Sequence, residues 1–387
     1  MKNTEVVNLL FTGDLCPQLS VEKMCIENRS DDLYDDQFRA VLRDKDLSVT
    51  NLECPLTDRS NPIVKSGPAL KSSKAAVAAL TSGYFDVAAL ANNHILDQGG
   101  DGVTDTLNVC AQAGIATVGA GVNAEEASRI LYKQVKGSTI AIINVAEHEF
   151  CVAKKDSQGA NPLNPVQNYY HIKEAKEKAE YVIMVIHGGN EHYPLPNPSM
   201  VDMYRYFADL GVTAVIGHHS HFAGGYEIYQ GVPIFYSLGN FLFDTEKERP
   251  TYWHQGYLVK LALRKDQTPE IQLVPYTQEK HNDSFQVRLM KGEAKQDYLN
   301  TINKYGRIIQ DRELLQTHWE GFLEEKRGMY YAQLLGLNRV QRYLFKKHIL
   351  GKQMVDEKRI PVLANLFRCQ AHREAIVATL EHDFNLR

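Results

Sequence analysis

The sequence predicts an α/β protein with a largely parallel core, followed by an all-helical C-terminal segment. Two observations predict this class. In the first two-thirds of the chain, short apolar runs alternate with stretches of helical spacing, which is typical of layered α/β domains. After about residue 283, strand patterns stop and apolar residues recur at helical spacing. We therefore expect two domains, residues 1–282 and residues 283–387.

The predicted strands are nearly continuous, β-branched runs, as expected of strands that are buried on both faces. They cover residues 6–12, 47–52, 86–91, 115–118, 139–145, 181–186, 213–216 and 233–238. Helical spacing between them predicts helices near 35–44, 73–82, 102–114, 168–179 and 199–210. Near 226–274 one strand pattern follows another directly, so we expect consecutive antiparallel strands at 227–229, 234–237, 257–263 and 271–274.

The composition is that of a folded, soluble protein. Of 387 residues, 44% are hydrophobic and 23% are charged, which excludes disorder and fibrous repeats as the main theme. The formal charge of −4 is too weak to indicate DNA binding, so no nucleic-acid partner is expected. No segment reaches the ~20 apolar residues of a membrane helix, and the N-terminus lacks a signal-peptide pattern. With six scattered cysteines, these features predict a cytoplasmic protein without an integral membrane segment.

Polar side chains fall where the predicted strands end. The loops that follow five strands carry Asp14, Asn51, Glu53, Asn93, His94, His187, His218, His219 and His221. The carboxyl ends of parallel strands share one sheet edge, so these groups are expected to converge. Carboxylate, amide and imidazole groups together suit one or two divalent ions of manganese, iron or zinc. A turn or a helix cap is enough to explain the polar residues at any single strand end. Three histidines within residues 217–221, however, have few structural uses.

Several motifs occur in an order that points to a family. They are Gly-Asp at 13–14, Asn-Leu-Glu-Cys-Pro-Leu-Thr at 51–57, Ala-Asn-Asn-His-Ile-Leu-Asp-Gln-Gly at 91–99, Gly-Ile-Ala-Thr-Val-Gly-Ala-Gly at 114–121, His-Gly-Gly-Asn-Glu at 187–191, Gly-His-His-Ser-His at 217–221 and Ile-Phe-Tyr-Ser-Leu-Gly-Asn-Phe at 234–241. Over about residues 8–263 the chain strongly resembles the CapA family of capsule and poly-γ-glutamate synthesis proteins, which is related to the calcineurin-like metallophosphoesterases. The resemblance implies a four-layer α/β sandwich of the metallophosphoesterase type with a two-metal site.

The resemblance also implies a role for each polar residue. His94 and His218 are assigned to catalysis, and the expected metal ligands are Asp14, Asn51, Glu53, Asn93, His187, His219 and His221. Glu53, or Asn51 beside it, would stand where phosphoesterases place a bridging acid, and His94 would be the acid near the leaving group. Relatives vary in the middle of Gly-His-x-x-His, which favours His218 over His219, so which of the two is the ligand stays open.

Two further pairs of residues are expected to contact substrate. Glu191 and Asn240 lie in the family motifs and would line the site. Lys65 and Lys71 follow the Glu53 loop and would meet an anionic polymer or phosphoester, although a solvated surface is the simpler explanation of such lysines.

The chain departs from the usual motifs at three places. Leu15 and Cys16 follow Asp14 where metallophosphoesterases have Asp-x-His, residues 51–53 replace Gly-Asp, and Ser220 stands where relatives commonly have proline. The leading prediction is a metal-dependent hydrolase, of the phosphoesterase type, that serves capsule or cell-envelope polymer synthesis in bacteria. The alternatives are a non-catalytic or metal-binding accessory protein that binds polymer or a partner enzyme, and a metal-dependent amidase acting on γ-glutamyl polymer.

The helical segment carries basic residues around an apolar stripe. They are Arg339, Arg342, Lys346, Lys347, Lys352, Lys358 and Arg359, near Leu344, Ile349 and Leu350. A basic face for a polyanion, a membrane surface or an acidic partner is one interpretation, and the charged solvent face of an amphipathic helix is the simpler one. A homo-oligomer contact or a capsule-enzyme contact through this segment is a further hypothesis.

Overall fold

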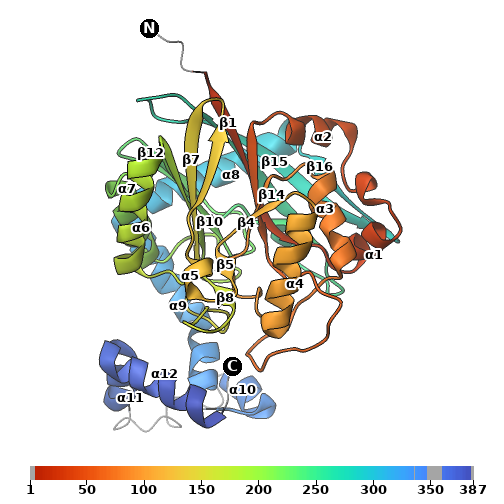
Figure 1. Ribbon diagram of the computed structural model, residues 1–387. Helices are drawn as coiled ribbons and strands as arrows, with labels where there is room; N and C mark the ends of the chain where they lie inside the picture. Colours follow the sequence, from red (N-terminus) through yellow and green to blue (C-terminus); the bar gives the residue numbers. More distant parts are fainter. Residues whose placement is uncertain (1–4, 335, 347–359, 385–387) are drawn as a thin grey trace. The chain divides into compact units, whose positions relative to one another are not determined.

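A computed structural model describes residues 5–334, 336–346 and 360–384 of the chain (Figure 1). The chain divides into two compact units, Met1–Asp311 and Arg312–Arg387. The first unit includes the strand β16 (Ser284–Leu289) and the helix α8 (Gly292–Gln310), which lie beyond the predicted boundary at residue 282. The expectation that strands end near residue 283 is therefore wrong, because the alternating Phe285 and Val287 are buried as β16 pairs with its neighbour. The assignment of two domains to residues 1–282 and 283–387 stays a prediction.

The first sheet of unit 1 combines a parallel half with an antiparallel half. Its strands lie in the order β16, β15 (Glu270–His281), β14 (Gln255–Leu263), β1 (Val7–Cys16), β2 (Leu47–Leu52), β3 (Val87–Ala89) and β4 (Ala116–Val118). The strands β1 to β4 are parallel, whereas β14, β15 and β16 are antiparallel to their neighbours. A short strand, β13 (Asn240–Phe243), pairs in parallel with the end of β1.

The second sheet has a parallel centre and antiparallel edges. Its order is β11 (Tyr226–Tyr229), β12 (Val232–Phe235), β10 (Ala214–His218), β9 (Tyr181–His187), β7 (Ser138–Ala146) and β6 (Leu131–Val135). The strands predicted at 226–274 are thus not consecutive neighbours, because the chain crosses from β12 in this sheet to β14 in the first. The hairpin β11–β12 and the pair β14–β15 are each antiparallel, as predicted. A separate two-stranded sheet joins β5 (Ala120–Gly121) to β8 (Gly159–Ala160).

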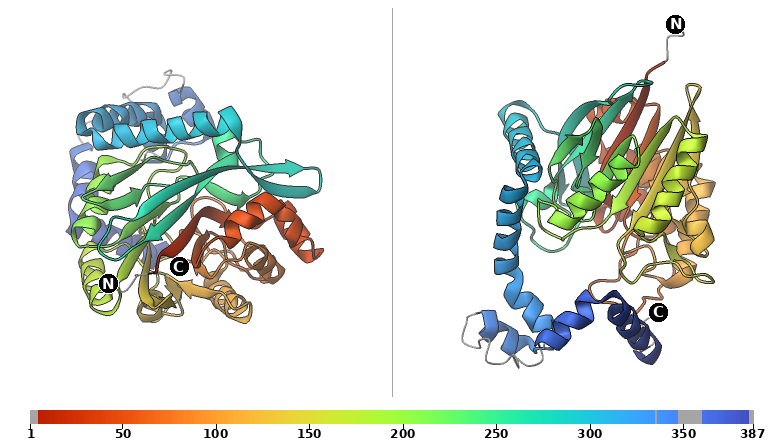
Figure 2. Two further views of the ribbon diagram at one scale, coloured as in Figure 1. Left: turned by 90° about the horizontal axis from the view of Figure 1, so that it is seen from above. Right: turned by 90° about the vertical axis from the view of Figure 1, so that its left-hand side faces the viewer.

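The two sheets pack face to face between two layers of helices (Figure 1, Figure 2). One apolar cluster fills the space between the sheets and contains Phe11 and Val87 from the first and Ile142, Ile183 and Ile216 from the second. A second cluster joins the other face of the first sheet to its helices, which are α1 (Ser20–Ile26), α2 (Asp36–Arg43), α3 (Val77–Ser82) and α4 (Gly99–Gln112). The helices α6 (Pro165–Lys178) and α7 (Pro198–Asp209) cover the second sheet. The four-layer α/β sandwich is confirmed, although the sequence pattern alone had not separated two sheets.

Buried polar contacts tie the two sheets together. Asn144 of β7 accepts a hydrogen bond from the backbone N–H of Ala91, after β3, at 2.7 Å, and donates to the carbonyl of Val185 in β9 at 3.2 Å. The Asn144 side chain therefore connects the loop after β3 in the first sheet with two strands of the second. A buried amide with both ends bonded fixes the mutual position of the sheets more specifically than apolar packing does.

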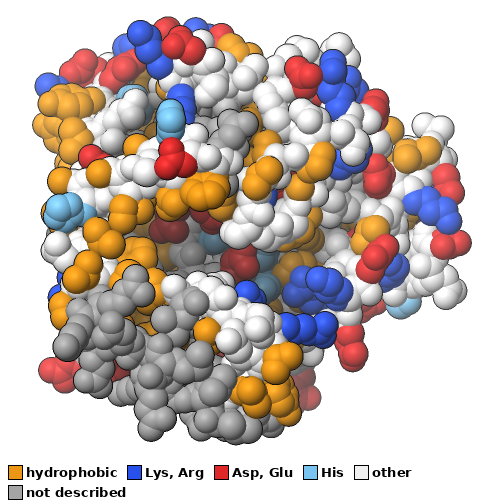
Figure 3. Space-filling model, turned by 90° about the horizontal axis from the view of Figure 1, so that it is seen from below, with side chains coloured by type: hydrophobic (Ala, Val, Ile, Leu, Met, Phe, Trp, Pro, Cys, Tyr) orange, Lys and Arg blue, Asp and Glu red, His pale blue; other side chains and the backbone are white. Residues whose placement is uncertain are grey.

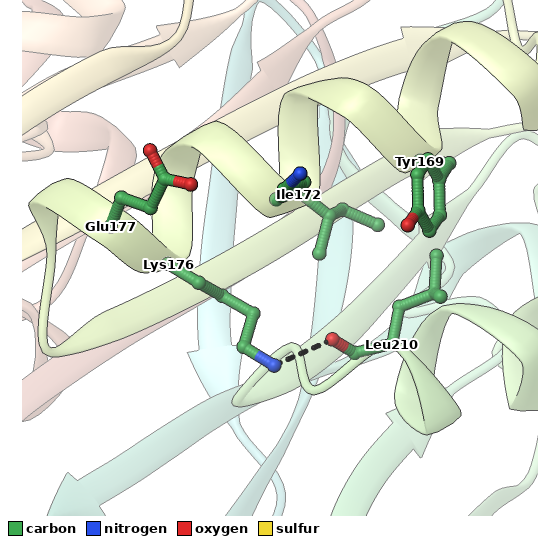
Figure 4. A pocket seen from close by; sticks show the side chains of 6 residues that line it. Tyr169, Ile172, Lys176, Glu177 and Leu210 are labelled. Carbon is green, nitrogen blue, oxygen red and sulfur yellow. Dashed lines mark hydrogen bonds between the residues drawn. The ribbon is translucent and has the colours of Figure 1, made fainter.

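A shallow groove of 330 Å³ lies on the outer helical layer, between α6 and the C-terminal end of α7 (Figure 4). It is lined by Tyr169, Ile172, Lys173, Lys176, Glu177 and Leu210. The Lys176 ammonium donates a hydrogen bond to the Leu210 carbonyl at 2.9 Å, which satisfies one of the free carbonyls at the end of α7. We ascribe a structural role to this contact.

The second unit is helical throughout its described residues, as predicted. Its helices are α9 (Arg312–Leu334), α10 (Arg339–Lys346), α11 (Ile360–Arg368) and α12 (Gln370–Phe384). Of the predicted basic face, Arg339 and Arg342 lie on α10, while the side chain of Lys346 and all of Lys347, Ile349, Leu350, Lys352, Lys358 and Arg359 lie outside the described residues. Among the helices that are described, none combines the length and apolarity that crossing a membrane requires.

Candidate metal centre

The predicted polar residues converge at one end of the sandwich. Asp14 lies on β1, Asn51 on β2, His187 at the end of β9 and His218 at the end of β10. Two sheets therefore contribute, rather than the single sheet edge that the sequence suggested. Seen from below, acidic and histidine side chains lie in a hollow of this face (Figure 3). Contacts cross between the sheets: His218 Nδ1 lies 2.9 Å from Asp14 Oδ1, and His187 Nδ1 lies 3.2 Å from Asn51 Nδ2.

Close backbone approach explains how Asp14 reaches this position. A side-chain Cβ on Gly13 would lie 1.9 Å from the carbonyl oxygen of Gly239, so only glycine fits there. The neighbouring N–H of Asp14 donates to that same carbonyl at 2.9 Å. The segment before β13 is thereby held directly against β1.

Two of the clustered histidines have strained backbones. His219 has φ of 96° and His221 has φ of 55°, in the left-handed region that histidine rarely adopts. Such a conformation costs on the order of 1–3 kcal/mol and persists where surrounding contacts impose it. One such contact is the hydrogen bond from the His219 N–H to Asp14 Oδ2 at 3.1 Å. Strain of this kind is concentrated at functional sites.

One group of potential ligands surrounds His187 Nε2, and we call it the His187 side. Asn93 Oδ1 and His219 Nδ1 each lie 3.0 Å from this nitrogen, and Glu53 Oε1 lies 3.6 Å from it. Glu53, His187 and His219 offer donor atoms that all lie within 4.8 Å of one another. Atoms at these separations suit a single cation placed among them.

A second group, the Asp14 side, consists of Asp14, Glu53 and His221. His221 Nε2 lies 3.7 Å from Glu53 Oε1. Asn240 orients the ring: its Nδ2 donates to the Trp253 carbonyl at 3.2 Å, so its Oδ1 accepts from His221 Nδ1 at 2.8 Å. Nε2 of His221 is then the unprotonated nitrogen, with its lone pair free for a metal. Glu53 belongs to both sides.

The buried oxygens in the middle of the cluster test whether a cation fits. Both carboxylate oxygens of Glu53 and Oδ1 of Asn51 are buried without a hydrogen-bond partner among the described residues. Leaving one such group unsatisfied costs about 1–3 kcal/mol, and more for a charged group. Burial, and then the charge of Asp14, raises the pKa of Glu53 well above its ordinary value. A divalent cation in either donor group would satisfy an oxygen of Glu53, so the residues fit the metal site that the family resemblance implies.

Burial keeps the histidines in the form that binds metals. It lowers the pKa of His219 to about 4 and that of His221 to about 4, and it lowers the pKa of His187 well below its ordinary value. The rings are therefore neutral near pH 7, as ligation requires. For Asp14, burial raises the pKa, but the hydrogen bond and charge of His218 outweigh that effect and hold the pKa below its ordinary value.

Beside this cluster, His94 is held by a buried carboxylate. His94 Nδ1 lies 2.6 Å from Asp97 Oδ2, which also accepts from the Leu70 N–H at 2.6 Å. Lys65 Nζ donates to Asp97 Oδ1 at 2.7 Å and to the Asn93 carbonyl at 2.8 Å, and its side chain is only 3% exposed. Lys65 is thus buried and paired rather than a solvated surface lysine. Sequence reasoning assigned no role to Asp97, although it lies in the motif that contains His94.

The remaining candidates lie around the cluster. Glu191 is exposed, and its charge acts on Glu53 and His221. Lys71 Nζ donates to the Arg59 carbonyl at 2.7 Å. Cys16, at the position where the sequence motif of metallophosphoesterases has histidine, is buried in one cluster with Cys54, and burial followed by the neighbouring Cys54 thiol raises its pKa well above the ordinary value.

Sequence reasoning missed Glu149, in the loop after β7. Its Oε1 lies 3.8 Å from His219 Nε2, and burial raises the pKa of its carboxylate while the Asn93 side chain opposes that rise. The sequence does indicate Glu149, because Glu147-His-Glu149 follows the predicted parallel strand 139–145 just as the predicted ligands follow their strands.

Comparisons with known proteins are consistent with these observations. Residues 8–245 match the family described as "Bacterial capsule synthesis protein PGA_cap". "PGA biosynthesis protein CapA" of Bacillus subtilis (strain 168) is 32% identical over 275 residues, which cover 70% of this chain and 71% of the relative. "Capsule biosynthesis protein CapA" of Bacillus anthracis is 30% identical over 286 residues, which cover 71% of this chain and 68% of the relative.

The chain is also similar to proteins that match over a shorter length or at lower identity. A "Probable polyglutamine synthesis accessory protein" of Mycobacterium tuberculosis is 30% identical over 214 residues, which cover 52% of this chain and 56% of that protein. Among solved structures, the 5'-nucleotidase from Candida albicans aligns with a TM-score of 0.41 and 10% identity, covering 82% of this chain and 57% of its own. A hypothetical protein from Thermus thermophilus aligns with a TM-score of 0.41 and 13% identity, covering 69% and 99% of the two chains.

Proposed function

The chain belongs to the PGA_cap family of bacterial capsule synthesis proteins, and from this premise we propose that it is a metal-dependent hydrolase of the phosphoesterase type that acts in capsule or cell-envelope polymer synthesis. The observation that carries the proposal is the pair of unsatisfied oxygens on Glu53, buried between the His187 side and the Asp14 side. A carboxylate in this position is costly without a cation and serves well as a bridge between two cations.

The residues of each side would hold one ion. On the His187 side these are Glu53, Asn93, His187 and His219, and on the Asp14 side they are Asp14, Glu53 and His221. Divalent ions at such a site supply Lewis-acid activation of water and of the scissile phosphoryl group. Of the two candidates that the sequence left open, we assign ligation to His219 and assign to His218 the positioning of Asp14 through its Nδ1 contact.

His94 would deliver the proton to the leaving group. A carboxylate only accepts hydrogen bonds, so the contact with Asp97 places a proton on His94 Nδ1 and leaves Nε2 as the nitrogen that can exchange a proton with substrate. Lys65 offsets the charge of Asp97 and keeps that carboxylate in place.

Metal analysis of the full chain, purified without chelator, tests the proposal. We expect about two divalent ions of manganese, iron or zinc per chain and hydrolysis of a generic phosphodiester. His94→Ala should retain both ions and lose turnover, because His94 belongs to neither donor group. An active His94→Ala variant would refute the proton-donor role. Less than one tightly bound ion per chain, with no hydrolysis restored by added manganese, would contradict the hydrolase proposal.

A second candidate function is that of an accessory protein that binds polymer or a partner enzyme. Two observations favour it: Cys16 replaces the histidine of the usual Asp-x-His motif, and one relative is named an accessory protein. Full metal occupancy without turnover of phosphodiesters or γ-glutamyl amides would favour this role. Turnover of the amide alone would favour the amidase alternative.

The location and partners form part of the same proposal. The six cysteines are free, which suits a reducing cytoplasm. We propose that the C-terminal helices contact a second copy or a capsule enzyme, since their described part exposes large apolar side chains such as Val362, Phe367 and Phe384. Cell fractionation and the molecular mass of the purified chain, with and without residues 312–387, test these two points.

A further inference from the structure

The loop after β7 brings one carboxylate, Glu149, against two predicted ligands of the His187 side. The Asn93 amide acts on the Glu149 carboxylate, and Oε1 of Glu149 lies 3.8 Å from His219 Nε2. Its charge also acts on Glu53, in the middle of the cluster. The Glu149 side chain is 37% exposed, and the family motifs identified in the sequence do not include it.

We propose that Glu149 is a positioning residue of the metal centre, which turns the oxygen of Asn93 and the nitrogen lone pair of His219 toward the ion on the His187 side. The inference rests on the proposed function, because it concerns the same ion. It adds a residue that neither the sequence motifs nor the two donor groups include.

The Asn93 amide lies between Glu149 and His187, and each neighbour faces a different end of it. Burial raises the pKa of the Glu149 carboxylate, whereas the Asn93 amide lowers it as a nearby N–H donor does, so the NH₂ end of Asn93 is the end that acts on Glu149. The other end of the amide, Oδ1, then faces His187 Nε2, which lies 3.0 Å away. Without Glu149 the amide can rotate, and its NH₂ would face the cation and repel it.

Glu149 also affects the tautomer of the His219 ring. Its two ring nitrogens face different neighbours: Nδ1 lies 3.0 Å from His187 Nε2, and Nε2 lies 3.8 Å from Glu149 Oε1. A negative charge near Nε2 favours the tautomer with the proton on that nitrogen, which leaves the Nδ1 lone pair directed toward the ion. Both effects prepare ligands of the same ion.

Glu147, in the same loop, provides a matched control. Its carboxylate accepts from the Gly189 N–H at 3.2 Å, and it belongs to neither donor group found among the described residues. Replacing it removes the same charge from the same loop without touching Asn93 or His219.

The experiment is a calorimetric titration of the metal-free full chain with Mn²⁺, for the wild type and for Glu149→Ala, Glu149→Gln and Glu147→Ala. We expect Glu149→Ala to weaken one of two binding steps by about 10- to 100-fold, which is typical of residues that orient ligands. Glu149→Gln should lose less affinity for Mn²⁺, because its amide oxygen can still accept a hydrogen bond from Asn93. Glu147→Ala should bind like the wild type, and the metal-free variants should unfold at similar temperatures.

Three results would overturn the inference. One is wild-type affinity in Glu149→Ala, another is an equal loss in Glu147→Ala, and the third is an equal loss in both Glu149 variants, which would assign direct ligation instead of positioning. A wild-type chain that binds no Mn²⁺ would overturn the proposed function as well, so the two failures are distinguishable.

Discussion

The two sides of the metal centre share Glu53 but differ in how firmly they can hold a cation. On the His187 side, Asn93 and His219 join His187, and Glu149 approaches from the next loop. On the Asp14 side, His221 is the one nitrogen donor of its group, and Cys16, packed near Cys54, stands where the metallophosphoesterase motif has a histidine. The difference teaches that two ions at such a centre need not be equivalent, and that the His187 side should be the tighter site.

The largest effect is expected from Glu53→Gln, because Glu53 is the carboxylate that both sides share. Both binding steps should weaken by more than about 100-fold, which metal analysis by mass spectrometry can follow. The metal-free variant should be more stable than the metal-free wild type, since a buried, unpaired carboxylate is lost. Retention of either ion would contradict the bridging position of Glu53.

The next pair of variants separates the sides. His187→Ala should lose the tighter ion and keep the weaker one, whereas His221→Ala should do the reverse, so that each retains about one ion per chain. Asn240→Ala, which removes the group that orients His221, should weaken only the Asp14 side. Manganese titrations measure all three, and loss of both ions in His221→Ala would show that the sides are not separate.

Acid should affect both sides alike. The folded-state pKa values of His219 and His221 are about 4, against an ordinary 6.5, so their neutral rings contribute stability that is complete above pH 6.5 and is lost as the pH falls toward 4. Each histidine should contribute on the order of 1 kcal/mol or more. Thermal unfolding of the metal-free chain at several pH values should show this loss, and His221→Ala should show less of it. An identical pH dependence in the variant would contradict the lowered pKa of His221.

The smallest effect is expected from Cys16→Ala. Because Cys16 is buried in one cluster with Cys54 and belongs to neither donor group found among the described residues, metal affinity should change by no more than about twofold, while the lost packing costs about 1 kcal/mol of stability. Calorimetry measures both quantities. Loss of the weaker ion in this variant would make Cys16 a ligand of the Asp14 side.

The sequence predicted the strands and the site residues that follow them better than it predicted their arrangement. Asp14, Glu53 and His187 could be found because each follows a strand pattern, and the carboxyl ends of parallel strands converge. The apolar pattern alone could not divide the strands between two sheets, since a continuous apolar run looks the same in either sheet and pairing is non-local, so this part of the fold was expected only from the family resemblance. The burial of Lys65 was missed for a similar reason: its partner, Asp97, is distant in the chain and is brought near only by the fold.

Glu53 follows β2 of the first sheet, whereas in the second sheet His187 ends β9 and His219 follows β10. An ion held by all three would add its binding free energy to the association of the two sheets. Thermodynamic linkage makes this gain about 2.7 kcal/mol when free ion exceeds the dissociation constant a hundredfold. The fraction of the protein that is folded in a cell would then depend on how well that cell is supplied with transition metals, and starvation for them would lower it.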